Sequence, residues 1–412
     1  MTTDLLSGLN PKQKEAVLHT EGPLLILAGA GSGKTRVIAH RIAYLVEALG
    51  IPLETILAVT FTNKAAGEMR DRVLSLLSQK AERGNLLTFH SICLKILRQQ
   101  AHLIGLKNDF VIYDTQDQAA MMKSVLSDLV IDAAVYPPKR FLGLISQLKN
   151  QLILPAQYAE GRSASALQEK LKQVYPFYQQ KLRAASAVDF DDLIGLTIQL
   201  FQTQADLLAR FRDRFQYLMI DEYQDTNYAQ YLLTRFWVGE RRNICVVGDD
   251  DQSIYAFRGA DVGNILKFER DYPDAKVVVL DQNYRSTEVI LSAAGAVISK
   301  NQTRKAKVLW TEKGMGEPIL VTEVEDEMGE ARFVRETSAK GMRDGQPLSD
   351  FCILYRTHAQ SRVLEEQLRN QGIPYLIFGG IRFYERREIK DLIAYLRLIF
   401  SPEDTVSLRR VI

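Results

Sequence analysis

The stretch PLLILAGAGSGKT, residues 23–35, decides the fold of this 412-residue chain. A short apolar run leads into a turn rich in glycine, and a helical pattern follows over residues 34–48. Such a run is typical of a buried strand in a parallel sheet, where function gathers at the carboxyl ends of the strands. We therefore expect an α/β protein whose working residues lie at one edge of its sheet.

Similar apolar runs predict the other strands. Most of them end in Gly, Asp or Thr, and they cover residues 55–61, 216–222, 243–249, 275–281 and 349–356. Helices are predicted over 63–77 and 359–370, and the second helix stops at Gln371-Gly372 before a further expected strand, IPYLIF (373–378). The stretch 111–186 has no clear strand and contains Pro137-Pro138, so we expect a mostly helical insertion there.

The composition excludes several classes of protein. The chain is 46% hydrophobic and carries three scattered cysteines without metal-binding spacing, so we expect a globular protein without structural zinc. No apolar run reaches the roughly 18 residues of a membrane span, and MTTDLLSGLN (1–10) is no secretory signal, which favours a cytoplasmic location. The net charge is only +2, so a nucleic acid would need a local groove.

The glycine-rich turn has the features of a Walker A phosphate-binding loop. It follows a predicted strand and opens a predicted helix, so its amide groups and the helix N-terminus can face phosphate oxygens. Lys34 would reach the β- and γ-phosphates of a nucleotide, and the Thr35 hydroxyl would hold Mg²⁺. Ala28 replaces the first glycine of the strict pattern. The expected nucleotide-binding residues of this segment are Ala28, Gly29, Ala30, Gly31, Ser32, Gly33, Lys34 and Thr35.

A pair of acids ends the predicted strand YLMIDE, residues 217–222. Asp221 would bind Mg²⁺, directly or through water, and Glu222 would orient and deprotonate the attacking water. Neighbours in an extended strand point to opposite sides, so the two carboxylates could face different partners. Together with the loop, the pair predicts hydrolysis of a Mg²⁺-bound nucleoside triphosphate.

Eight segments, taken in order, resemble the motif set of superfamily 1A DNA helicases of the UvrD/PcrA/Rep type. They are LNPKQKEAV (9–17), VTFTNKAAGEMRDRV (59–73), TFHS (88–91), VDFDDL (188–193), DEYQDTN (221–227), VGDDDQSIYAFRGAD (247–261), LDQNYRST (280–287) and LYRTHAQSRVLEEQL (354–368). The resemblance implies a RecA-like P-loop NTPase with a parallel sheet and a helical insertion, followed by part of a second RecA-like domain.

The resemblance implies nucleotide contacts outside the loop, with ATP and Mg²⁺ as cofactors. Gln13 would read the adenine edge, because its amide offers both a donor and an acceptor. Tyr284 would stack on the base and Arg36 would flank it. Gln252 would sense the γ-phosphate as a catalytic residue, and Arg285 would reach the same phosphate from the second α/β unit.

The resemblance also assigns residues to single-stranded DNA. Aromatic rings would stack on bases, and two rings two residues apart would face one side if their segment is extended. Phe257 stands where the family commonly has tryptophan, which keeps a stacking face but loses an N–H. The expected DNA-binding residues are Phe61, His90, Phe190, Tyr255, Phe257, Arg258 and Arg356.

The resemblance divides the chain into four regions. We expect a first RecA-like domain (1A) over 1–110 and 187–280, its helical insertion (1B) over 111–186, and part of a second RecA-like domain (2A) over 281–382. Residues 383–412 would begin an inserted helical domain (2B). Segments V and VI of the family find no match, so we expect a truncated chain without the second arginine finger.

Two functions remain open at this point. The first is an ATP-dependent DNA translocase and helicase, moving 3′→5′ as the family does and acting on single strands and single–double strand junctions. It would be a monomer working in DNA repair or replication, with possible protein partners from those processes. The alternative is a truncated module that binds nucleotide and single-stranded DNA without unwinding duplex. The motor half of a helicase–nuclease would require a nuclease domain that the sequence does not show.

Overall fold

The computed structural model describes residues 5–78, 84–161, 164–302, 304–305, 307–378 and 387–412. The chain forms two compact units, one comprising residues up to 316 together with 393–412, the other residues 317–392. The expected domain boundary at 382 lies outside the described residues. No helix among the described residues is both long enough and apolar enough to span a membrane.

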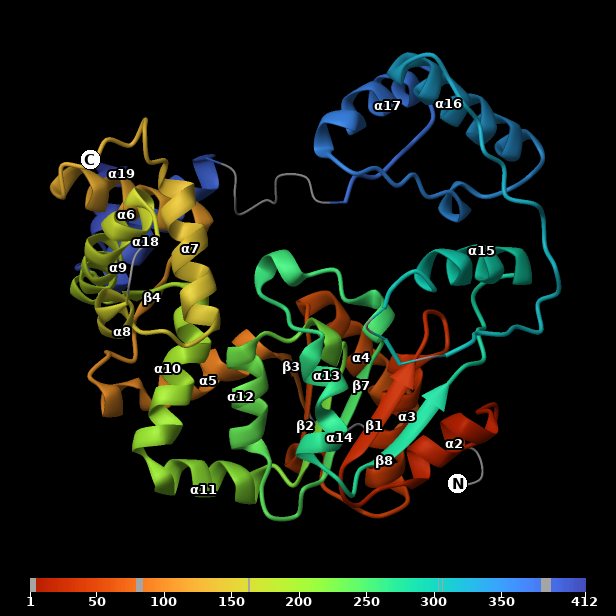
Figure 1. Ribbon diagram of the computed structural model, residues 1–412, viewed down its shortest axis with the longest axis horizontal. Helices are drawn as coiled ribbons and strands as arrows, with labels where there is room; N and C mark the ends of the chain where they lie inside the picture. Colours follow the sequence, from red (N-terminus) through yellow and green to blue (C-terminus); the bar gives the residue numbers. More distant parts are fainter. Residues whose placement is uncertain (1–4, 79–83, 162–163, 303, 306, 379–386) are drawn as a thin grey trace. The chain divides into compact units, whose positions relative to one another are not determined.

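The first unit is built on a six-stranded sheet whose order is β3-β2-β6-β7-β1-β8 (Figure 1). All of the neighbouring strands are parallel, which confirms the predicted α/β class. Five strands match the sequence prediction, and β3 was missed. The strands are β1 (Leu24–Ala28), β2 (Ile56–Thr60), β3 (Asn85–Thr88), β6 (Tyr217–Ile220), β7 (Ile244–Gly248) and β8 (Lys276–Leu280).

The alternation of side chains along the strands divides the core into two layers. Leu24 and Ile26 of β1 pack with α2 (Pro11–Leu18), α3 (Lys34–Glu47) and α4 (Asn63–Leu76). Leu25 and Leu27 of the same strand pack on the opposite face. The helices of that face are α5 (Phe89–Gln100), α10 (Phe190–Thr203), α11 (Ala205–Arg214), α12 (Tyr228–Trp237), α13 (Gly263–Leu266) and α14 (Phe268–Asp271).

The expected insertion is mostly helical and has a core of its own. It contains α6 (Thr115–Asp128), α7 (Pro138–Asn150), α8 (Pro155–Glu160) and α9 (Ala166–Ala184). One difference from the prediction is that two short strands, β4 (Val111–Ile112) and β5 (Ala187–Val188), pair in parallel at the two ends of the insertion, where it joins the sheet domain. These strands were missed because two residues carry no readable pattern.

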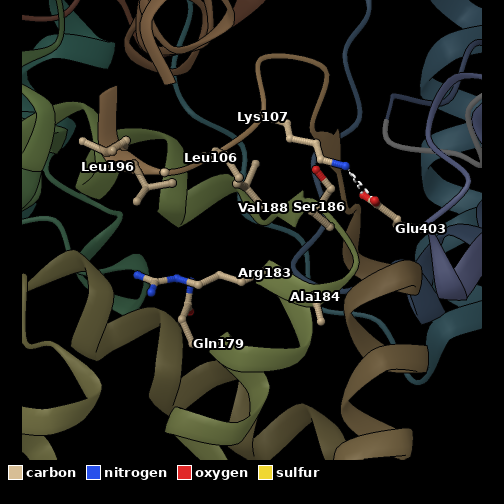
Figure 2. A pocket seen from close by; sticks show the side chains of 12 residues that line it. Leu106, Lys107, Gln179, Arg183, Ala184, Ser186, Val188, Leu196 and Glu403 are labelled. Atoms are coloured by element: carbon tan, nitrogen blue, oxygen red, sulfur yellow. Dashed lines mark hydrogen bonds and ion pairs between the residues drawn. The ribbon is translucent and has the colours of Figure 1, made fainter. Parts of the chain in front are cut away.

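The end of the chain packs on this insertion. Helix α18 (Arg387–Phe400) is followed by α19 (Thr405–Val411), and Tyr113 donates a 2.7 Å hydrogen bond to the buried carboxylate of Asp404. Arg397 pairs with Asp117 at 2.8 Å. Figure 2 shows a pocket beside these contacts, where Lys107 pairs with Glu403 near Ser186 and Arg183. This pocket has no glycine loop and no carboxylate pair like that of the candidate nucleotide site.

Helix α15 (Glu288–Ile298) belongs to the first unit, and the second unit contains α16 (Glu327–Arg343) and α17 (His358–Asn370). Helix α17 begins one residue before its predicted start. The strands expected at 349–356 and 373–378 are absent from the described part of this unit. A strand needs a hydrogen-bonded neighbour, and Leu354 and Leu376 instead remain 89% and 86% exposed.

Candidate nucleotide and DNA site

The loop between β1 and α3 has its carbonyl oxygens engaged by donors from the protein. The carbonyl of Gly29 accepts from the Ser32 hydroxyl at 2.7 Å, and that of Ala30 accepts from Asn283 Nδ2 at 2.6 Å. The carbonyl of Gly31 accepts from the Tyr284 amide at 2.9 Å. With these acceptors turned away, the amide groups at the start of α3 are the groups that a phosphate would meet.

Two loop glycines are required by their conformation and surroundings. Gly31 and Gly33 have φ of 71° and 88°, in the left-handed region that glycine adopts without strain. A Cβ atom at Gly31 would also lie 2.6 Å from Asn283 Nδ2 and 2.7 Å from Arg285 Cβ. The loop therefore combines a tight turn with a close approach of the 283–285 segment.

Gln13 supports the same loop from helix α2. Its Nε2 donates to the Ser32 carbonyl at 2.9 Å, and its Oε1 accepts from the Asn10 amide at 3.1 Å. Helix α2 is fixed to α3 by the buried Arg41, which donates to the carbonyls of Ala16 at 3.0 Å and of Thr20 at 3.1 Å. These bonds satisfy carbonyl groups at the end of α2 and hold Gln13 beside the loop.

Lys34 and Thr35 meet the two acids predicted to work with them. Lys34 Nζ lies 3.4 Å from Glu222 Oε2, and the Thr35 hydroxyl lies 3.4 Å from Asp221 Oδ2. Burial, and next the charge of Glu222, raise the pKa of Asp221 to about 7. A cation bound here would stabilise the ionised carboxylate, and a hydroxyl plus a carboxylate is the oxygen donor set that Mg²⁺ prefers. The residues present therefore fit a magnesium ion.

A buried glutamine that we did not predict as a site residue joins the acid pair to the next strand end. Gln224 Nε2 donates to Glu222 Oε2 at 2.9 Å, and its Oε1 accepts from the Asp249 amide at 3.0 Å. Gln252 in turn donates to Asp249 at 2.5 Å. The expected γ-phosphate sensor is thus linked to the expected general base through two residues. Gln224 lies in DEYQDTN, but nothing in that pattern distinguished it from its neighbours.

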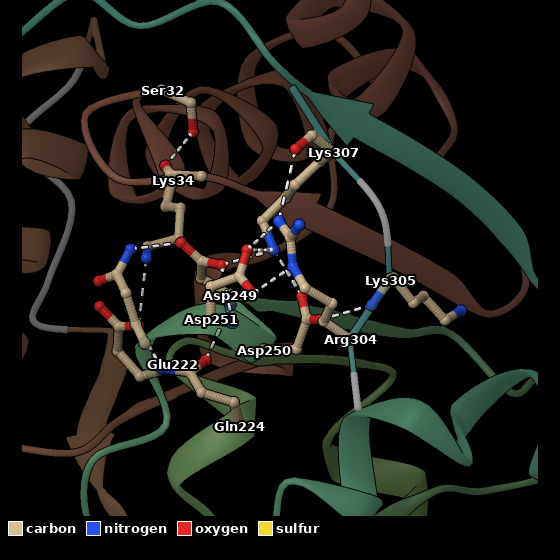
Figure 3. A network of polar contacts seen from close by, with 12 residues as sticks. Ser32, Lys34, Glu222, Gln224, Asp249, Asp250, Asp251, Arg304, Lys305 and Lys307 are labelled. Carbon is tan, nitrogen blue, oxygen red and sulfur yellow. Dashed lines mark hydrogen bonds and ion pairs between the residues drawn. The ribbon is translucent and has the colours of Figure 1, made fainter. Parts of the chain in front are cut away.

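Three consecutive acids beside Gln252 are neutralised by a basic segment (Figure 3). Lys307 Nζ lies 2.8 Å from Asp249, 2.6 Å from Asp250 and 2.8 Å from Asp251, and its side chain is only 4% exposed. Arg304 makes two 2.8 Å bonds to Asp251. The acids are close enough together to hold a metal ion, but the Lys307 ammonium already lies among them. No sequence pattern pointed to Arg304 or Lys307.

The predicted QNYR segment reaches the loop through its backbone and side chains. Tyr284 is 41% exposed, and its hydroxyl donates to Gln282 Oε1 at 2.8 Å and accepts from Asn10 Nδ2 at 2.8 Å. Arg285 is exposed next to Gly31. Arg36 flanks the same region and lies close to Gly8. The residues predicted for nucleotide binding in this unit therefore gather around one loop.

The predicted DNA-binding residues of the first unit form two groups. Phe61 stacks on Tyr255 with ring centroids 5.0 Å apart, and Phe257 follows at 6.0 Å from Tyr255. Arg258 lies over both of the latter rings. The segment is a short 3₁₀ helix, Ala256–Arg258, rather than extended, so the rings gather by packing and not by strand alternation. Phe257 is 73% exposed and free to meet a base.

The second group contains His90 and Phe190, whose rings meet edge to face at 6.1 Å. Phe190 is 47% exposed at the first residue of α10. Burial lowers the pKa of His90, so its ring is neutral at physiological pH and would act through a hydrogen bond rather than a charge. The remaining predicted DNA-binding residue, Arg356, is exposed and belongs to the second unit.

Comparison with known proteins identifies the family of the chain. The model of the UvrD/REP helicase N-terminal domain matches residues 9–273, and that of the UvrD-like helicase C-terminal domain matches residues 278–412. The chain belongs to the UvrD/REP helicase family. The two matches together cover every motif quoted from the sequence.

Curated members of this family are similar over nearly the whole chain. The ATP-dependent DNA helicase UvrD1 of Mycobacterium tuberculosis is 50% identical over 99% of this chain and 54% of its own length. The ATP-dependent DNA helicases PcrA of Leuconostoc citreum and Staphylococcus aureus are 50% and 49% identical, again over 99% of this chain. The chain spans about half the length of these relatives.

Proposed function

We propose that this UvrD/REP family chain is a DNA-stimulated ATPase that moves along single-stranded DNA and acts at single–double strand junctions. The observation that carries the proposal is the meeting of Lys34 and Thr35 with Glu222 and Asp221 at 3.4 Å. The relatives are ATP-dependent DNA helicases, which supports the same activity. The direction of movement would be 3′→5′, in repair or replication, by a cytoplasmic monomer.

The nucleotide would be bound by the loop amides, with Gln13 and Tyr284 beside the adenine and Arg285 near the γ-phosphate. Mg²⁺ would be held by Thr35 and Asp221 and would supply charge that neutralises the phosphate oxygens. Lys34 would exchange Glu222 for a phosphate, which would release the Glu222 carboxylate to take a proton from water. Gln252 would respond to the γ-phosphate and report through Asp249 and Gln224.

The four regions 1A, 1B, 2A and 2B are part of the proposal, with the boundaries given above. The family matches meet between residues 273 and 278, close to the proposed end of 1A at 280. The proposed insertion, 111–186, is bracketed by β4 and β5. DNA would be bound by the two aromatic groups of 1A and by Arg356 of 2A.

A lysine substitution tests the proposed nucleotide site. Lys34→Ala should abolish ATP turnover, because it removes the only side-chain cation proposed for the β- and γ-phosphates in the loop. Turnover would be measured with and without a single-stranded oligonucleotide, and Lys12→Ala, an exposed lysine of helix α2, is the control. Unchanged turnover in Lys34→Ala would refute the assignment of this loop.

A further inference from the structure

The last turn of helix α7 lies where three proposed functional segments meet. Lys149 and Asn150, the final two residues of α7, belong to the insertion, yet both contact the main sheet domain. Lys149 contacts the start of α10, which carries Phe190. Asn150 contacts Asn227 of the segment that begins with the Asp221–Glu222 pair. Neither residue has a role in the proposed chemistry.

Lys149 holds the two carboxylates on either side of the Phe190 backbone. Its Nζ lies 2.6 Å from Asp189 Oδ2 and 2.7 Å from Asp192 Oδ1. Asp189 caps α10, and the two aspartates exchange side-chain to backbone bonds of 3.0 and 3.1 Å. Tyr178 adds a 3.2 Å bond to Asp189. Gln179 Nε2 donates to Asp192 Oδ1 at 3.0 Å. The buried Lys149 is therefore the one cation in a set of contacts, shared with Tyr178 and Gln179, that holds the first turn of α10 and with it Phe190.

The charge balance makes this lysine hard to replace. Burial alone would lower the pKa of Lys149, but the charges of Asp189 and Asp192 raise it overall, so the ammonium stays charged. Asp191 adds a third carboxylate nearby, and its side chain is bonded to Ser146 one turn earlier in α7. Removing the ammonium would leave three carboxylates facing one another, and they would relax by moving apart.

Asn150 makes the second link. Its Oδ1 accepts a 2.7 Å bond from Asn227 Nδ2, and Asn227 is a buried N-cap of α12. Asn227 also pairs through its backbone with Ala260, two residues after Arg258. A Cβ atom at Gly259 would lie 3.6 Å from Asn150 Cβ. The segment 255–259, which carries the rings of Tyr255 and Phe257 and is called the aromatic loop below, therefore contacts the Asn150 side chain. Asn150 thus contacts the acid-pair segment and the aromatic loop together.

We propose that Lys149 and Asn150 are positioning residues that fix the DNA-facing rings relative to the acids of the nucleotide site. Lys149 fixes Phe190 for stacking on a base, and Asn150 links the aromatic loop to the segment of Asp221 and Glu222. The inference rests on the proposed function, because it assigns the rings to DNA. It adds that the insertion, through one helical turn, couples DNA contact to ATP turnover.

Lys149→Met tests the first role, because methionine keeps the length of the side chain and removes the charge. Its affinity for a single-stranded oligonucleotide should fall about tenfold, the loss expected for one base stack. Nucleotide affinity should stay within about twofold, because the contacts of Lys149 are with Asp189, Asp192 and Tyr178, none of which is proposed to bind nucleotide. The control is Lys139→Met, an exposed lysine at the start of the same helix, which should leave both affinities unchanged.

The dependence of DNA affinity on salt separates positioning from direct contact. A lysine that touches phosphate lowers the slope of log affinity against log salt by about 1 when it is removed. Lys149 is only 8% exposed, so the slope should not change in Lys149→Met. A slope lower by about 1 would make Lys149 a phosphate ligand and overturn the inference, as would DNA affinity equal to that of the unaltered chain.

Two further variants complete the test. If Lys149→Met does not fold, Tyr178→Phe removes one bond to Asp189. This variant should also bind DNA more weakly, with the salt slope unchanged. DNA binding equal to that of the unaltered chain would overturn the first role. Asn150→Ala should bind DNA and nucleotide like the control Gln151→Ala but lose at least half of the DNA stimulation of turnover. Full stimulation would overturn the second role. An unaltered chain that binds no single-stranded DNA would overturn the proposed function as well.

Discussion

Glu222 adopts a left-handed backbone conformation, with φ 52° and ψ 45°, just beyond the end of β6. This region costs a non-glycine residue on the order of 1–3 kcal/mol, and such strain gathers at functional sites. The turn brings Glu222 to Lys34 while Asp221 faces Thr35. The sequence analysis expected the two carboxylates to point to opposite sides because side chains alternate along a strand. That reason does not apply, because the strand ends at Ile220 and the turn at Glu222 separates the carboxylates instead.

Gln13 offers a test at the residue scale, because its two amide atoms are bonded to Ser32 and Asn10 rather than free. Gln13→Ala should weaken ATP binding by about tenfold or more and inorganic triphosphate binding by a smaller factor. The triphosphate loses only loop support, whereas ATP loses the adenine contact as well. The measurement is calorimetric titration with both ligands, and an equal loss for the two would leave Gln13 no role in base recognition.

Asp191 gives a prediction for the dependence of stability on pH. Burial, and next the charge of Asp189, raise the pKa of Asp191 from 3.8 to about 6. Between these values the folded chain holds a proton that the unfolded chain has lost, so the contribution of Asp191 to stability falls as the pH rises. Asp191→Asn should therefore be more stable than the unaltered chain above pH 6 and converge with it below about pH 4.

Urea unfolding at pH 4 and pH 7.5 measures this difference. The exposed Asp213→Asn on helix α11 is the matched control and should change stability equally little at both values. A gain in Asp191→Asn that is the same at pH 4 and pH 7.5 would contradict the raised pKa.

At the scale of elements, the sequence predicted the strands and helices that a strong local pattern specifies. Strands β1, β2, β6 and β7 are short runs of buried residues, and their existence and parallel pairing follow from burial on two faces. Strand β8, at the edge of the sheet, is apolar but only partly buried. Strand β3 was missed because NLLT is brief and begins with a polar residue. The run at 349–356 has strand propensity but no hydrogen-bonded neighbour, and a sequence cannot supply one.

The candidate site was also predictable only where a local sequence pattern marks it. The predicted loop, the acid pair, Phe61 and the segment around Phe257 each end or follow a strand of the six-stranded parallel sheet, whereas Phe190 follows β5 of the separate two-stranded sheet. Gln224, Arg304, Lys307 and Lys149 were not predicted, because their roles come from contacts with residues distant in sequence. Local patterns identify groups that perform chemistry far better than the groups that hold them.

The 3₁₀ segment 256–258 separates two modes of DNA contact within one element. Phe257→Ala should weaken binding of a single-stranded oligonucleotide about tenfold with the salt slope unchanged, because stacking involves no counterion release. Arg258→Ala should lower the slope by about 1 if its guanidinium meets a phosphate. Fluorescence anisotropy at several salt concentrations measures both, and identical salt slopes in the two variants would contradict the separate roles.

At the scale of the whole molecule, a net charge of +2 means that the proposed DNA binding would rely on local features. The exposed rings and Arg258 are the surface proposed for DNA in the first unit, and the proposed nucleotide loop follows β1 at the carboxyl edge of the six-stranded sheet. Residues 9–273 and 278–412 match the two family domains, which together cover the motifs found between residues 9 and 368. The central claim of the proposed function is that these motifs couple ATP hydrolysis to DNA binding.

Steady-state ATP hydrolysis, with and without a single-stranded oligonucleotide, tests that claim most directly. We expect the oligonucleotide to raise turnover severalfold, and Glu222→Gln to lose at least 100-fold in turnover while still binding ATP, because the amide cannot accept the proton of water. Turnover that ignores the oligonucleotide, or that survives in Glu222→Gln, would contradict the account. ATP binding without any turnover would reduce the chain to a nucleotide-binding module.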